Sequence, residues 1–192
     1  MFEFHINFWV IFDKKVITMK YFGLVLLTLV LVSATVNIEL EKRSLLNNRL
    51  ELKIPKDFQI MSEEMLNTKY PSANRPKMVY TNKTGGINVA LNLTESQASQ
   101  SQIDSYKDYL VQTFESVYPS AEWKSSGVTT INGRKIGYLE LVTPAIDAEI
   151  YNLIFFTDLD GKLLLCTFNC TVDSMNEWSP AAKEIMHSLR VK

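Results

Sequence analysis

Histidine, cysteine and glycine are scarce in this sequence: its 192 residues include two histidines, two cysteines and seven glycines. Two cysteines are too few for a disulfide framework, and so few histidines and glycines offer little material for metal cages or phosphate-binding loops. An excess of positive charge is also missing, because Lys and Arg number 20 against 21 Asp and Glu. Surfaces that bind nucleic acids are usually basic, so we expect no nucleic-acid partner.

The composition that remains is that of an ordinary globular protein. Apolar residues make up 46% of the chain and charged residues 21%. This balance excludes intrinsically disordered and fibrous classes. The length suits one domain, either alone or preceded by a targeting segment.

The beginning of the chain has the pattern of an export signal. Basic residues lie ahead of an apolar run over residues 21–32, and small residues follow at 33–34. The basic residues are Lys14, Lys15 and Lys20. This order is typical of a secretory signal peptide, which we assign to residues 1–34. The alternative is an uncleaved membrane anchor over residues 21–36. We favour the signal peptide because this uncharged stretch is shorter than the about 20 apolar residues that a membrane-spanning helix needs.

Residues 1–18 are unusually apolar for the start of a signal peptide, and a start at Met19 would give a more ordinary one. Met1 and Met19 therefore both stay open as the initiator. Cleavage after Ala34 would remove three basic and two acidic residues and leave a mildly acidic exported chain. We expect such a chain not to bind an anionic membrane surface by charge.

Beyond the signal, residues 35–48 are polar and charged and are expected to form an extended lead-in, followed by a single domain over residues 49–192. Polar–apolar alternation and apolar runs predict seven strands in this domain. They cover residues 49–54, 77–81, 87–93, 123–131, 134–142, 148–157 and 162–170. Glycine-containing turns at 82–86, 132–133 and 158–161 join them in hairpins, Asn-Gly being the strongest short signal.

Three helices are predicted between and after the strands. Ser62 can accept a hydrogen bond at the start of a short helix that reaches Lys69. Residues 102–117 place apolar side chains at spacings of three and four on one face, and a final helix covers residues 175–189.

This order of elements predicts an α+β fold. Tight hairpins require antiparallel neighbours, so the strands form an antiparallel sheet of six to seven strands with helices on both faces. Residues 152–157 (NLIFFT) are apolar at successive positions. We therefore expect this strand to be central and covered on both sides.

Several segments resemble the PsbP-like family. They are LELKIPKDFQI (50–60), NGRKIGYLEL (132–141), YNLIFFTDLDGKLLLCTFNCT (151–171) and the closing helix with Ile185, Ser188 and Leu189. The family includes an extrinsic photosystem II subunit, a Ran-binding nucleotide-release factor and bacterial exported proteins. The resemblance implies a sheet sandwiched by helices (an α/β/α sandwich) and a role in binding or assembly. In the family, the first strand segment is often followed by glycine and tryptophan after the proline, whereas this chain has Lys56-Asp57-Phe58 there. No metal-binding or partner-binding residue is carried over.

Catalytic residues are not predicted. After Ala34 the chain keeps one histidine, His187, in the last turn of the closing helix, where a cationic imidazole suits the negative helix end. Hydrolysis by a serine or cysteine needs a histidine beside the nucleophile, and the G-x-S-x-G pattern is missing. Paired carboxylates have no spacing signature, so acid–base chemistry stays open as a minor alternative.

Cys166 and Cys170 lie four apart on one face of a predicted strand, which separates them by about 13 Å at about 3.3 Å per residue. A disulfide needs Cα atoms within about 7 Å. We therefore expect two buried thiols, and an intramolecular bond is open only if the strand breaks after Phe168. Cys166, Cys170 and His187 supply only three side-chain ligands, so they cannot form a four-ligand zinc site.

Two other short segments contain parts of ligand-binding motifs. Asp158-Leu159-Asp160-Gly161 contains part of a calcium-loop pattern but lacks the third acid and the glutamate at position twelve, so we expect a hairpin turn. Gly85-Gly86 lacks the lysine and helix start of a phosphate loop.

Glycosylation sequons and dispersed aromatic residues give weaker signals. The sequons begin at Asn82, Asn92 and Asn169 and matter only in a eukaryotic secretory pathway. The aromatic residues off the main core stripes are Tyr80, Tyr109, Tyr118, Trp123 and Phe156. If these side chains were exposed, they would mark a protein interface. We favour the alternative interpretation, that they cover the second layer of the sandwich.

The sequence therefore predicts an exported, non-enzymatic module, periplasmic or extracellular, that binds a protein or stabilises an envelope complex. The partner is not identified, the binding residues are unassigned, and no cofactor or metal is expected. The alternatives are a small-ligand carrier with a pocket between sheet and helix, and a membrane-anchored form of the same module.

Overall fold

The computed structural model of the chain describes residues 38–72 and 75–192. The predicted signal peptide (1–34), the alternative anchor (21–36) and the candidate start Met19 lie outside the described residues. Within the described part, none of the helices has the length and hydropathy of a membrane span.

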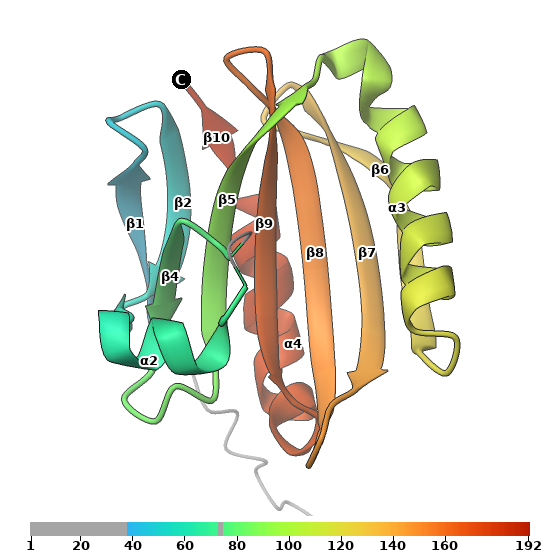
Figure 1. Ribbon diagram of the computed structural model, residues 1–192. Helices are drawn as coiled ribbons and strands as arrows, with labels where there is room; N and C mark the ends of the chain where they lie inside the picture. Colours follow the sequence, from blue (N-terminus) through green and yellow to red (C-terminus); the bar gives the residue numbers. More distant parts are fainter. Residues whose placement is uncertain (1–37, 73–74) are drawn as a thin grey trace, which may run out of the picture. The chain divides into compact units, whose positions relative to one another are not determined.

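The centre of the fold is a seven-stranded antiparallel sheet with the order β3-β4-β5-β9-β8-β7-β6 (Figure 1). Its strands are β3 (Gln59–Ile60), β4 (Met78–Thr81), β5 (Asn88–Gln97), β6 (Glu122–Ile131), β7 (Arg134–Pro144), β8 (Glu149–Leu159) and β9 (Lys162–Thr171). The prediction of an antiparallel sheet of six to seven strands is confirmed.

Two of the tight hairpins are fixed by residues with positive φ. Asn132 and Gly133 have φ of 49° and 80° between β6 and β7, and Asp160 and Gly161 have 51° and 74° between β8 and β9. Positive φ at both central positions is the type I′ geometry that matches the twist of paired strands. The predicted turns at these positions are confirmed.

Strand β8 buries both of its faces, as the NLIFFT segment predicted. Leu153 and Phe155 pack in one hydrophobic cluster, and Ile154 and Phe156 pack in a second cluster on the opposite face. All four side chains are buried.

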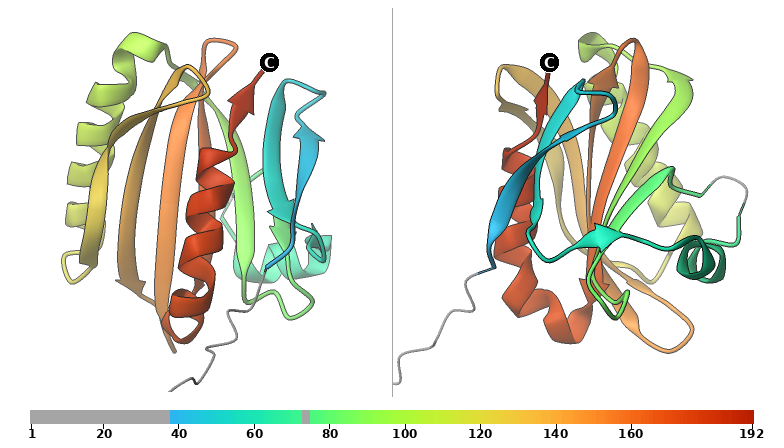
Figure 2. Two further views of the ribbon diagram at one scale, coloured as in Figure 1. Left: turned by 180° about the vertical axis from the view of Figure 1, so that it is seen from behind. Right: turned by 90° about the vertical axis from the view of Figure 1, so that its left-hand side faces the viewer.

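Helices cover the two faces unequally (Figure 2). Helices α2 (Glu63–Lys69) and α3 (Ile103–Val117) lie on one face, and α4 (Val172–His187) lies on the other. A 3-10 turn, η1 (Gln100–Gln102), leads into α3. Ser62 accepts a hydrogen bond from the Met65 amide at the start of α2, so the predicted cap is confirmed.

A small second sheet differs from the prediction. Strands β1 (Leu40–Leu45), β2 (Leu50–Pro55) and β10 (Arg190–Val191) form it in the order β1-β2-β10. We predicted a single sheet that included the strand at 49–54, and an extended lead-in over residues 35–48. Instead β2 pairs on its second side with β10, from the end of the chain, and β1 is a paired strand.

The small sheet covers the same face of the main sheet as α4 (Figure 2). Leu50, Leu52 and Ile54 have no exposed surface and join the core cluster that includes Phe168 and Ile185. Burial of these aliphatic side chains holds the second sheet in place, since each contributes about 1.5–3 kcal/mol.

Candidate functional site

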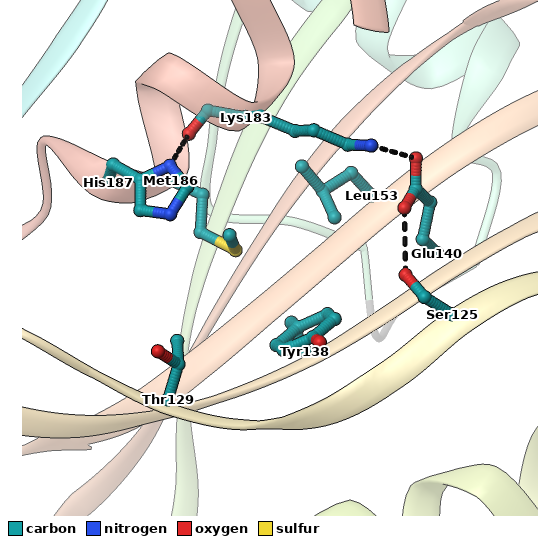
Figure 3. Close-up of a pocket in the computed structure, with 8 residues that line it drawn as sticks. All are labelled: Ser125, Thr129, Tyr138, Glu140, Leu153, Lys183, Met186 and His187. Carbon is teal, nitrogen blue, oxygen red and sulfur yellow. Dashed lines mark hydrogen bonds and ion pairs between the residues drawn. The ribbon is translucent and has the colours of Figure 1, made fainter. Parts of the chain in front are cut away.

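The described part of the chain contains an open groove between α4 and the main sheet. Helix α4 lies over β8 and β9, and among the described elements no helix covers β6 and β7 on this side (Figure 2). A pocket of about 250 Å³ lies there. It is lined by Ser125, Thr129, Tyr138, Glu140, Leu153, Lys183, Met186 and His187 (Figure 3).

A second, shallower pocket of about 450 Å³ continues the first along the helix. The two share Ser125, Glu140 and Lys183. From α4 they take Met175, Ser179, Lys183, Met186 and His187. Four of these residues follow one another at intervals of four and so lie on one stripe of the helix. We call the two pockets together the α4 groove.

Glu140 lies at the base of the groove and is the acidic residue of its lining. Its carboxylate accepts hydrogen bonds of 2.8 Å from the Ser125 hydroxyl and 2.8 Å from the Tyr151 hydroxyl. The Lys183 ammonium, from α4, lies 3.1 Å away. Glu140 is 8% exposed, and buried charges are tolerated when they are paired in this way. The network therefore fastens α4 to β6, β7 and β8.

Opposing effects set the acidity of this network. Burial alone raises the pKa of Glu140, but the hydrogen bonds from Ser125, Tyr151 and Lys183 outweigh burial, and the pKa lies below its usual value. Burial, together with the Glu140 carboxylate, raises the pKa of Tyr151 well above its usual value. Glu140 is therefore ionised and Tyr151 neutral at physiological pH.

The floor of the groove keeps unused hydrogen-bonding capacity. Within residues 38–72 and 75–192, the hydroxyls of Thr129 and Tyr138 have no hydrogen-bond partner. Gly127 makes room for the Tyr138 ring, because a Cβ at this glycine would lie 3.0 Å from the Tyr138 hydroxyl oxygen. Together with the half-exposed Lys183 ammonium, these groups can bind polar atoms of a ligand.

His187 lies in the last turn of α4, as predicted. Its Nδ1 atom is 2.7 Å from the Lys183 carbonyl oxygen, at the helix end where a cation is favoured. Within the described residues no hydroxyl or thiol is hydrogen-bonded to its ring. The groove thus contains a histidine, but not one paired with a nucleophile.

No protein-family model matches this chain, and no curated protein matches its sequence. Solved structures do match it. Cyanobacterial PsbP from Synechocystis sp. PCC 6803 has a TM-score of 0.61 at 15% identity, over 86% of this chain and 99% of its own. This chain has a PsbP-like fold. The fold that the sequence resemblance implied is therefore confirmed.

A second structure shares the PsbP-like fold. LpqN from Mycobacterium tuberculosis, described as involved in cell envelope biogenesis, has a TM-score of 0.53 at 9% identity. The match covers 84% of this chain and 96% of LpqN. At these identities the likeness concerns the fold, and site residues have to be argued from this chain itself.

The two cysteines of the PsbP-like domain are free and buried on β9, as expected. Cys166 and Cys170 are 0% and 1% exposed. Burial raises the pKa of Cys166 above its usual range and that of Cys170 to about 12, the latter with a contribution from Glu177. Both are therefore protonated thiols, which are poor nucleophiles and metal ligands.

We expect neither thiol to react with an aromatic disulfide reagent at about pH 8 while the protein is folded. Both should react within the mixing time once a denaturant unfolds the chain. Absorbance of the released thiolate measures this reaction. Rapid reaction of the folded protein, or a disulfide found by mass spectrometry, would contradict the assignment.

The acids of the β8–β9 turn are engaged by cations of the protein. Asp158 lies 2.6 Å from Arg134, and Asp160 lies 2.5 Å from Arg49. Among the described residues, no group of three or more His, Cys, Asp and Glu side chains could hold a metal ion. The hairpin-turn interpretation of residues 158–161 is confirmed. Gly85, with φ of 74°, lies in the loop between β4 and β5, as predicted.

The dispersed aromatic residues mostly belong to the sandwich layers. Tyr80 and Phe156 are buried and Tyr118 and Trp123 are half-buried, whereas Tyr109 on α3 is 62% exposed. The interpretation that they cover the second layer therefore holds for all except Tyr109. Of the sequon residues, Asn169 is engaged by the Asn88 side chain at 2.9 Å.

Sequence reasoning missed the Glu140 network. Its members are far apart in the sequence, so spacing gave no signal. One signal was present: Glu140 is the only charged residue in the apolar run GYLELV (137–142). A charge within a buried strand is rarely tolerated without partners, so it marks a position worth examining.

Proposed function

We propose that this protein is an exported, non-enzymatic binding module that holds a protein partner in the α4 groove. The observation that carries the proposal is the groove itself. It combines an apolar wall from Leu153 and Met186 with unpaired hydroxyls and a half-exposed lysine. Such mixed surfaces, with a few polar groups beside apolar ones, are typical of protein recognition sites.

The size and chemistry of the groove favour a protein over a small-ligand cargo. Carriers of drug-sized ligands use mostly apolar pockets of about 300–1,000 Å³ that enclose the ligand. The deeper pocket here has about 250 Å³, the second, of about 450 Å³, is shallow and does not enclose a ligand, and Ser125, Glu140 and Lys183 line both of them. A partner side chain fits such a pocket better than a whole apolar ligand.

The chemistry of the groove also gives no support to catalysis. Glu140 is held ionised by three partners, and Lys183 is engaged by that carboxylate. A general base needs a pKa near the working pH, and neither the lowered pKa of Glu140 nor the raised pKa of Tyr151 provides one.

The exported location is supported by the signal pattern in residues 1–34. The fold shared with LpqN, an envelope-biogenesis protein, agrees with it. A reporter that is active only outside the cytoplasm, fused after Lys192, tests the location. We expect activity for the full chain and its loss when residues 1–34 are deleted. Activity retained without these residues would overturn the exported location.

Site-specific photocrosslinking tests the groove. A photoreactive phenylalanine would replace Ser179 in the groove or, as the control, the exposed Glu177 on the side of the same helix turned away from the groove. We expect one protein, identified by mass spectrometry, to crosslink at 179 and not at 177. Equal crosslinking at both positions, or crosslinking at neither, would overturn the proposal.

A further inference from the structure

The four outer strands of the two sheets differ in how they are protected against pairing. β3 and β10 have two residues each, and β1 has Glu41, Lys42 and Arg43 at successive positions. β6 is ten residues long, and its segment 125–131 (SSGVTTI) has neither a charged residue nor a proline. Short length, charge and proline are the usual means by which edge strands avoid other chains, so β6 is the unprotected edge.

The β6–β7 hairpin determines which backbone groups of β6 face outward. Its two-residue turn makes Ile131 and Arg134 a hydrogen-bonded pair, and hydrogen-bonded pairs alternate along an antiparallel ladder. The amides and carbonyls of Ser126, Val128 and Thr130 therefore point away from β7. Among the described residues, these groups have no backbone partner.

The flank of α3 above this edge has a matching pattern. Lys107, Val111 and Glu115 lie on one helical stripe at intervals of four. Tyr106, on the other flank, bonds the Gln97 carbonyl at the end of β5, so the stripe faces the β6 side. Within the described chain, Glu115 has no ion pair and Lys107 pairs only with its neighbour Asp108.

From these observations we infer that β6 pairs with β6 of a second copy of this chain. The two strands run antiparallel about a two-fold axis at Val128. Val128 of one copy then forms a hydrogen-bonded pair with Val128 of the other, and Ser126 of each copy pairs with Thr130 of the other. The two seven-stranded sheets become one continuous sheet, and no charges oppose each other across the new strand pair.

Charge complementarity favours a second copy over a foreign strand. The two-fold axis makes the two α3 helices antiparallel. Val111 lies midway between Lys107 and Glu115, so stripes that meet at Val111 place each lysine against the other copy's glutamate. Val111 and Val128 pack against the same hydrophobic cluster, so both symmetry points lie on the α3 side of the edge. A C2 interface requires such self-complementarity.

The pairing also changes the α4 groove, although it does not depend on the groove's function. Gly127 lies between Ser126 and Val128, whose backbone groups point outward. It pairs with Tyr138, so both residues are on the side of the main sheet that forms the groove floor. In the proposed register, Thr129 of the second copy stands opposite Gly127. The side of the groove beyond β6 is then closed by the second copy.

Sedimentation velocity and a charge exchange at the edge test the pairing. Protein purified from expression of the full chain is expected to be a dimer at micromolar concentrations. Ser126→Lys with Thr130→Lys places like charges opposite each other twice and should raise the dissociation constant about ten-fold or more. Ser126→Lys with Thr130→Glu places opposite charges together and should keep the dimer. Ser126 and Thr130 are exposed, so both variants should fold.

The outcomes separate this register from other assemblies. A wild-type monomer at these concentrations overturns the inference, including the case in which the monomer binds a foreign strand at β6. A dimer unaffected by the two lysines places the interface elsewhere. Hydrogen exchange gives a second readout, because the amides of Val128 and Thr130 should be protected in the dimer and exchange rapidly on dilution to monomer.

Discussion

Replacing Gly137 with alanine is expected to lower the free energy of unfolding by about 2–3 kcal/mol, the upper range for overpacking a core. Gly137 on β7 pairs with Phe156 on β8, and the Phe156 ring lies directly over the glycine, in contact with the place a Cβ would occupy. Phe156 is fully buried, so its ring cannot move into solvent. Urea unfolding followed by tryptophan fluorescence measures the change.

Gly86→Ala is the matched control. A Cβ at Gly86 would have Thr84 Oγ1 as its nearest neighbour, at 3.4 Å, so we expect a change within about 0.5 kcal/mol. Adding Phe156→Leu to Gly137→Ala should relieve the clash, and the double variant should lose at least about 1 kcal/mol less than the two single losses combined. Additive losses would show that the ring does not rest on Gly137.

Glu140→Ala is expected to cost about 2–4 kcal/mol at neutral pH. The change leaves the buried Tyr151 hydroxyl without its acceptor, a loss of about 1–3 kcal/mol, and opens a cavity at the base of the groove. Lys183 loses its partner as well, but this ammonium is half exposed and can be hydrated. Glu149→Ala, at an exposed acid at the start of β8, is the control and should change stability little.

The contribution of Glu140 should also depend on pH in one direction. The folded state holds the pKa of Glu140 below the usual value of 4.5. A lowered folded pKa adds stability that is fully present above the unfolded pKa and is lost as the pH falls through the folded pKa. Urea unfolding of wild type and Glu140→Gln should therefore differ most at about pH 7 and converge below about pH 4. A difference that grows on acidification would contradict the network.

Local chemistry explains which parts of the fold were predictable from the sequence. Asn132-Gly133 and Asp160-Gly161 require positive φ at adjacent positions, and few backbone geometries other than a tight hairpin use it. The apolar run 152–157 predicted a strand covered on both faces because both sets of alternate residues need burial. These features depend on neighbours in the sequence, so the sequence was sufficient.

The features that the sequence did not predict depend on distant partners. β2 is in a separate sheet because β10, from the last residues of the chain, takes its second edge. β1 has charged residues at three successive positions, so no alternation distinguished it from a lead-in. The partners of Glu140 are Ser125 on β6, 15 residues before it, Tyr151 on β8, 11 residues after it, and Lys183 on α4. Only the folded chain brings them together.

The affinity of the purified protein for the partner crosslinked at position 179 is the most direct measurement of the central claim. Ser179→Trp would fill the α4 groove with an indole ring, whereas Glu177→Trp adds the same ring to the exposed side of the helix that is turned away from the groove. By isothermal titration calorimetry, we expect Ser179→Trp to weaken binding at least about ten-fold, which is 1.4 kcal/mol, and Glu177→Trp to leave it unchanged. Equal affinity of the two variants would contradict a binding role for the groove.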